Sequence, residues 1–132
     1  MTRQFPKIDP QEPTIVQTDV ELAIARDGID WEAGDVLTLP EGVRMKIVNE
    51  NDAEARTDFF VKFPPGYVEP EHTHEGAHAS LVLEGRMLVD GHELTPGDYY
   101  YGQNVPHGPM EYPDGCTMFA SFVGGDVAHE EQ

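Results

Sequence analysis

The sequence predicts an all-β protein built as an antiparallel sandwich or barrel. Short apolar or alternating segments recur about every 8 to 12 residues, and Gly or Pro separates most of them. The length agrees with this class, because 132 residues suffice for one domain with a real core and are too few for two ordinary domains. We therefore expect one small β domain.

Three parts are expected along the chain: an N-terminal arm over residues 1–25, a barrel over 26–125 and a polar tail over 126–132. Three prolines favour an extended arm. Residues 14–25 fit either a short strand or one or two helical turns, and periodicity does not decide between them. Trp31 is expected to be a packing anchor near the barrel mouth or an interface residue.

The barrel strands are expected where apolar residues alternate or β-branched and aromatic residues gather. Val43, Met45 and Ile47 alternate with two basic residues, which is typical of a half-buried strand. Asp90-Gly91 is a hairpin signal. The expected strands cover residues 43–48, 58–63, 71–75, 77–84, 86–89, 92–94, 98–101 and 116–123.

Composition excludes several classes of function. With 25 acidic and 8 basic residues, the formal net charge is −17, which disfavours nucleic acid and anionic membranes as partners. No apolar run reaches the roughly 18 residues of a membrane span. The N-terminal sequence lacks an apolar signal core, and the single Cys116 excludes an intrachain disulfide. Together these features predict a cytoplasmic protein.

Four of the six histidines gather in one stretch of the chain. His72, His74 and His78 lie within seven residues, and His107 follows the Gly97-Asp98 turn. In an uninterrupted strand the first three would share a face, because successive side chains alternate. Crowded imidazoles need partners, and neutral imidazole is a common ligand of divalent transition metals. The stretch therefore predicts a metal site.

The same residues resemble a known family. Gly66-x5-His72-x-His74-x3-His78-x6-Gly85 resembles the first cupin motif, and Gly97-Asp98 through Pro106-His107 resembles the second. The resemblance implies a double-stranded β-helix of jelly-roll type, one divalent metal per chain and, frequently, a dimer. The sequence departs from the family pattern in having His78 where glutamate is usual. Its second motif is one residue short, with Glu111 where asparagine is frequent.

Two groups within the family are particularly similar. HTHEGAHASLVLEGRMLVDG and LTPGDYYYG resemble cupins that cleave acetylacetone, and they also resemble the cupin domains of zinc-binding anti-sigma factors. The first group implies a histidine-only iron site and O2-dependent cleavage of a carbon–carbon bond in a β-dicarbonyl or hydroxyketone. The second implies a sensor. A non-catalytic binding cupin and a metal-dependent isomerase or lyase remain as alternatives.

These observations give a specific site hypothesis. The metal ligands are expected to be His72, His74 and His107, with His78 as a fourth ligand or a residue behind the ligands. Fe2+ is favoured, and Zn2+, Ni2+, Mn2+ or Cu2+ would also suit imidazole donors.

Two residues beside the ligands are candidate catalytic groups. They are Glu111, if its strand faces inward, and Tyr100. Tyr99 and Tyr101 point opposite to Tyr100, so either Tyr100 or that pair is expected to line the barrel. The expected function is a metal-dependent dioxygenase acting on a small carbonyl or phenolic molecule, in a homodimer.

Overall fold

The computed structural model describes residues 14–17, 22–24, 31–33, 40–70, 72–73, 76–103, 106–107 and 109–124. The strands within these ranges are β1 (Thr14–Gln17), β2 (Leu22–Ile24), β3 (Glu32–Ala33), β4 (Arg44–Asn51), β5 (Arg56–Phe63), β6 (Tyr67–Glu69), β7 (His72–Thr73), β8 (Ala77–Gly85), β9 (Met87–Val89), β10 (His92–Leu94), β11 (Tyr99–Gln103), β12 (Pro106–His107), β13 (Met110–Tyr112) and β14 (Cys116–Val123). A short 3-10 helix, η1 (Asp52–Glu54), joins β4 to β5.

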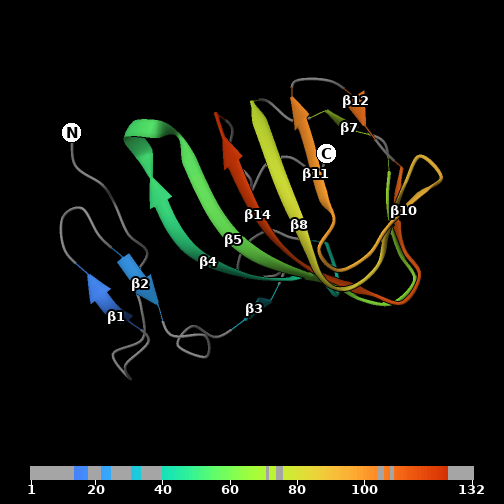
Figure 1. Ribbon diagram of the computed structural model, residues 1–132, viewed down its shortest axis with the longest axis horizontal. Helices are drawn as coiled ribbons and strands as arrows, with labels where there is room; N and C mark the ends of the chain where they lie inside the picture. Colours follow the sequence, from blue (N-terminus) through green and yellow to red (C-terminus); the bar gives the residue numbers. More distant parts are fainter. Residues whose placement is uncertain are drawn as a thin grey trace.

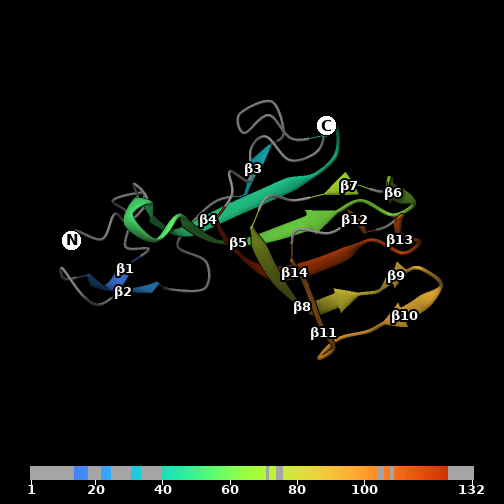
Figure 2. The same ribbon diagram turned by 90° about the horizontal axis from the view of Figure 1, so that it is seen from above.

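Two principal sheets make up the domain, as the strand rhythm predicts. One has the order β11-β8-β14-β5-β4-β3, and the other has the order β10-β9-β13-β6. Figure 2 shows β6, β13, β9 and β10 gathered on one side of the larger sheet. The described residues contain no helix long and apolar enough to cross a membrane.

Two small sheets complete the description. β12 pairs with β7, and β13 pairs with β6, in antiparallel registers that continue one another. The β7–β12 pair thus prolongs the smaller sheet toward one end of the barrel. Among the described strands, β1 pairs only with β2, and both lie to one side in Figure 1. Residues 14–17 and 22–24 are therefore strands, which decides against the helical alternative.

The core lies between the inner faces of the two principal sheets. Strand β14 shows how the sequence produces it, because Cys116, Met118 and Ala120 are buried while Thr117 and Phe119 between them are only partly covered. In β4, Met45 is buried and Arg44 exposed, as the alternation predicts. The two central rows of the inner face are Met45, Val61, Met118 and Val82, and Ile47, Phe59, Ala120, Ser80 and Tyr100.

Two glycines let strands approach more closely than side chains would permit. A Cβ on Gly76 would lie 2.2 Å from the carbonyl oxygen of Val123, and one on Gly85 would lie 2.1 Å from that of Gly115. Both residues also have positive φ, of 89° and 77°. They hold the two ends of β8 against backbone near the ends of β14.

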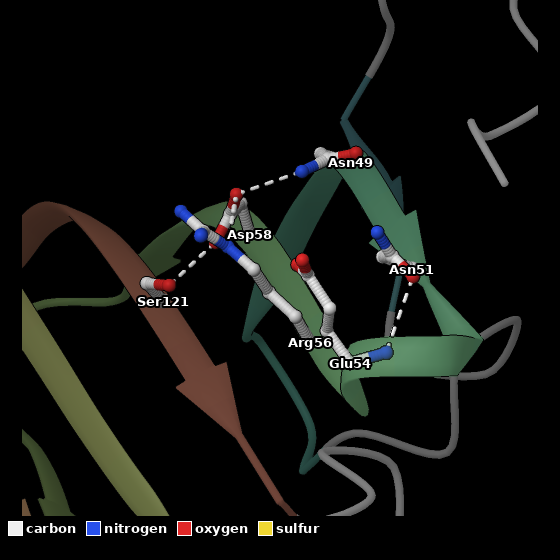
Figure 3. A network of polar contacts seen from close by, with 6 residues as sticks. All are labelled: Asn49, Asn51, Glu54, Arg56, Asp58 and Ser121. Carbon is white, nitrogen blue, oxygen red and sulfur yellow. Dashed lines mark hydrogen bonds and ion pairs between the residues drawn. The ribbon is translucent and has the colours of Figure 1, made fainter. Parts of the chain in front are cut away.

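The outer face of the larger sheet carries a polar network around Asp58. Asn49 and Ser121 lie opposite Asp58 on the two neighbouring strands, and both donate hydrogen bonds to its carboxylate. Arg56 Nε donates to the same carboxylate at 3.0 Å (Figure 3). This network joins β4, β5 and β14, and its carboxylate is almost fully buried.

Candidate metal centre

Backbone pairing brings two of the expected ligand positions together. His72 on β7 lies directly opposite His107 on β12 in an antiparallel pair. Directly opposed residues in such a pair have Cβ atoms about 4.5–5.5 Å apart. The two histidines are distant in sequence, so the fold itself creates this juxtaposition. His74 lies outside the described residues.

His78 occupies the inner face of β8, where it is 4% exposed. Its ring centroid lies 5.7 Å from that of Tyr100 and 5.2 Å from that of Phe122. Its cross-strand partner on β11 is Gly102, and a Cβ there would lie 2.7 Å from His78 Cε1. The imidazole therefore occupies space that any other residue at position 102 would restrict.

An uninterrupted strand from His72 to His78 is not what the structure shows. β7 ends at Thr73, Gly76 forms a bend, and β8 begins at Ala77. The simple alternation argument for a shared face therefore does not extend to His78. Its inward direction follows instead from its place in β8, where Ser80 and Val82 are buried with it.

Tyr100 is the tyrosine of its triplet that lines the interior. It is partly buried, whereas Tyr99 and Tyr101 are 63% and 52% exposed. Burial raises the pKa of the Tyr100 hydroxyl, and the nearby negative charge of Glu69 raises it further. Tyr100 thus remains a neutral phenol at physiological pH, next to both an imidazole and a carboxylate.

Glu69 is an inward carboxylate that the sequence analysis did not single out. Its Oε1 accepts a hydrogen bond of 2.9 Å from the hydroxyl of Tyr112, whose side chain is 1% exposed. The Tyr112 ring stacks on Phe63 with centroids 4.1 Å apart. Burial, followed by the charge of Glu69, raises the pKa of Tyr112 well above its usual value, so the phenol stays a donor. The available signal was the strand after the Gly66 turn, on which Tyr67 and Glu69 share a face.

Glu111, the expected carboxylate, lies on the other side of its strand. It is exposed between the buried Met110 and Tyr112 on β13. Strand alternation therefore directs it away from the core. A catalytic role for Glu111 stays a prediction, but the inner-face geometry favours Glu69 as the interior carboxylate.

The donor chemistry of these residues suits a transition metal. Neutral imidazole binds Fe, Cu, Ni and Zn, and two histidine positions meet on β7 and β12. Among the residues whose side chains are described, no three His, Cys, Asp or Glu groups meet in a metal-binding arrangement. Cys116 offers no alternative ligand, because burial raises its pKa to about 12 and keeps it a thiol.

A comparison with protein families bears directly on this site. The family model described as the ChrR cupin-like domain matches residues 23–123, which include all four histidines of the expected site. No curated protein has significant sequence similarity to the chain.

Solved structures with similar folds are cupins of several kinds. An RmlC-like cupin from Ralstonia eutropha JMP134 matches with a TM-score of 0.66 and 17% identity, covering 77% of this chain and 68% of that one. An acetylacetone dioxygenase from Acinetobacter johnsonii matches with a TM-score of 0.63 and 15% identity, covering 82% and 76%.

Another match is to a regulatory complex. The structure of Rhodobacter sphaeroides SigE with the anti-sigma factor ChrR gives a TM-score of 0.58 and 22% identity, covering 74% of this chain and 51% of that one. At these identities the three matches establish a shared fold. They include an oxygenase and a regulator, so the fold alone does not decide the activity.

Proposed function

The chain belongs to the ChrR cupin-like domain family, and on that premise we propose that it is a metal-dependent non-haem iron dioxygenase acting on a small carbonyl or phenolic compound. The observation that carries the proposal is the pairing of His72 with His107, which brings the two cupin motifs to one end of the barrel. His74 would complete a three-histidine set, and His78 would add a fourth imidazole or support the others.

The proposed ligands suit the proposed metal. Imidazoles are neutral ligands, so an all-histidine site would leave a divalent cation its full charge. A bound Fe2+ would supply Lewis acidity and redox reactivity toward O2. Zn2+, Ni2+, Mn2+ and Cu2+ also suit these donors and are the alternatives that metal analysis would distinguish.

The chain's own residues would bind and orient the substrate. Tyr100 can donate a hydrogen bond, because its hydroxyl stays protonated. Glu69, oriented by Tyr112, can accept one from an enol or phenol. Phe122 and Phe59, 5.1 Å apart, give the wall beside His78 an apolar surface that excludes water. These groups fit a small molecule with one hydroxyl or enol and a short apolar body.

The proposal is tested by metal content and oxygen consumption. We expect about one transition metal per chain after purification from unsupplemented medium. We also expect oxygen uptake after anaerobic loading with Fe2+, when the protein is offered acetylacetone or other β-dicarbonyls and hydroxyketones.

Ligand variants make this test specific. His74→Ala and His107→Ala should each remove most of the metal, because losing one ligand also leaves the others poorly placed. His78→Glu should retain metal, since a carboxylate is also a good ligand. His92→Ala is the matched control, because His92 is exposed in β10. Full metal content in both His74→Ala and His107→Ala would exclude the site.

A sensor or non-catalytic binding cupin is the second candidate, and the family description favours it. The similar fold in the complex of SigE with ChrR adds to it. For such a protein we expect tight retention of Zn2+ and no oxygen uptake with any member of the substrate panel. Loss of the same histidines should still release the metal, so the two functions share a site and differ in their chemistry.

We further propose that the protein acts in the cytoplasm as a homodimer on a small molecule. The lone Cys116 supports the cytoplasmic assignment, because a reducing compartment keeps thiols free. The homodimer and the small-molecule substrate rest on the resemblance to cupins.

A further inference from the structure

One buried hydroxyl on the inner face of the larger sheet, that of Ser80, has no hydrogen-bond partner among the described residues. Ser80 is 7% exposed and lies on β8 between the buried residues His78 and Val82. Because it shares their face, its side chain is directed into the barrel. Buried polar groups without a partner are rare in folded proteins, and each one requires an explanation.

The partner of this hydroxyl has to approach from the barrel interior. Strand β8 is paired on both sides, with β11 and with β14, so the neighbouring backbone groups are used in the sheet. The Ser80 oxygen is not sealed off by the described residues, so a small molecule can reach it. A polar atom of a bound ligand would therefore complete the missing hydrogen bond.

Ser80 belongs to a row of inner-face residues whose two central members are small. Tyr100 on β11 and Ala120 on β14 lie directly opposite Ser80, and Phe59 on β5 lies opposite Ala120. Two small side chains thus lie side by side between two aromatic rings. This part of the inner face presents one polar atom, from Ser80, beside the methyl group of Ala120.

The same row lies beside residues of the proposed site. His78 is two positions from Ser80 on the same strand, roughly 7 Å away along β8. The ring centroids of Tyr100 and His78 lie 5.7 Å apart. A ligand that is hydrogen-bonded to Tyr100 would therefore present its next atoms to Ser80.

We propose that Ser80 determines substrate specificity, because its hydroxyl forms a hydrogen bond with an oxygen on the body of the substrate, beyond the enol or phenol group. The substrate class is then a β-dicarbonyl or phenol that carries a further hydroxyl or carbonyl oxygen. This inference rests on the proposed function, since it takes the ligand to lie beside Tyr100 and His78. A site that pairs a buried hydroxyl with its ligand discriminates against an analogue that leaves the hydroxyl unpaired.

A matched pair of ligands tests this role. One is a β-dicarbonyl with a terminal ethyl group, and the other is its analogue with a hydroxyl in place of the terminal methyl. Isothermal titration calorimetry measures the binding of each to the full chain as purified, without oxygen, so that no turnover is needed. We expect the natural chain to bind the hydroxyl analogue at least tenfold more tightly.

Ser80→Ala removes only the hydroxyl, so the variant should keep its metal and lose the preference between the two ligands. We also expect the melting temperature of the ligand-free variant to be unchanged or higher, because an unpaired buried polar group has been removed. Thr117→Ala removes a hydroxyl from the outer face of β14 and is the matched control.

A natural chain that binds neither ligand, or both equally, would overturn the proposal. So would a Ser80→Ala variant that keeps the natural preference or weakens both ligands equally. A marked fall in its ligand-free melting temperature would also overturn it, because the protein itself would then satisfy the hydroxyl. The proposed function fails separately, when the natural chain consumes no oxygen whatever its binding preference.

Discussion

At the scale of single residues, the interior of this barrel depends on which of two glutamates faces inward. Glu69 accepts a hydrogen bond from the buried Tyr112, whereas Glu111 is exposed on the strand paired with that of Glu69. A buried hydroxyl hydrogen-bonded to a carboxylate orients that carboxylate and limits its rotation. Glu69 is therefore the fixed acidic group against which a hydroxyl-bearing ligand can be positioned.

Replacing Glu69 with glutamine tests this role at constant size. Under the proposed function, we expect Glu69→Gln to retain one metal per chain and to lower the rate of oxygen uptake about tenfold, which corresponds to the loss of one charge-assisted hydrogen bond. Metal analysis and an oxygen electrode measure the two quantities. Glu41→Gln, in an exposed turn, is the control. An equal loss of metal and of oxygen uptake would indicate that Glu69 is needed for metal binding, and not for positioning the substrate.

At the scale of elements, pairing between β8 and β11 defines the space for His78. Gly102 lies opposite His78, and the absence of a side chain there leaves room for the imidazole beside Tyr100. Pairing between β7 and β12 similarly places position 72 opposite position 107 in the backbone register. The candidate centre thus depends on two strand pairs that belong to different sheets.

Gly102→Ala should displace the His78 ring, because the added Cβ would lie 2.7 Å from its Cε1 atom. If His78 is a ligand, metal affinity should fall about tenfold or more, and the absorption spectrum of the Co2+-loaded protein should change. Gln103→Ala, at the adjacent exposed position, is the control. An unchanged spectrum in a folded Gly102→Ala variant would place His78 away from the metal.

At the scale of the whole molecule, the net charge and the buried carboxylate of Asp58 change the stability of the fold in opposite directions as pH falls. The chain carries a net charge of −17, and its isoelectric point is near 4.4. Mild acidification therefore relieves self-repulsion. Asp58 behaves differently. Burial alone would raise its pKa, but hydrogen bonds from Ser121, Asn49 and Arg56 outweigh burial, and the net shift is downward.

A lowered pKa in the folded chain means that ionised Asp58 stabilises the fold above the ordinary value of 3.8, and that this contribution disappears as pH falls through the lower folded value. We expect Asp58→Asn to lower the free energy of unfolding by about 2 kcal/mol at pH 7 and by less once the pH falls below the lowered pKa of Asp58. Urea denaturation across this range measures the difference. Asp114→Asn, which removes the exposed pair with Arg86, should cost less than about 1 kcal/mol. If the loss of unfolding free energy in Asp58→Asn did not depend on pH, the ionised form of Asp58 would not stabilise the fold more than the protonated form does.

The sequence by itself determined the all-β class, most of the strands and the motif spacing that carries the family resemblance. These features are local: alternation, turn residues and residue intervals can be read within a few positions. It also showed that Tyr100 must point opposite to Tyr99 and Tyr101.

Only the tertiary structure decided which direction is inward. Alternation relates neighbouring side chains to one another, but the face that meets the core depends on strands far away in the chain. That is why Glu69, and not Glu111, lines the interior, and why Tyr100, and not its neighbours, lies beside His78. The pairing of His72 with His107 and the inner-face neighbours of Ser80 arise in the same way, from registers between segments that no local pattern connects.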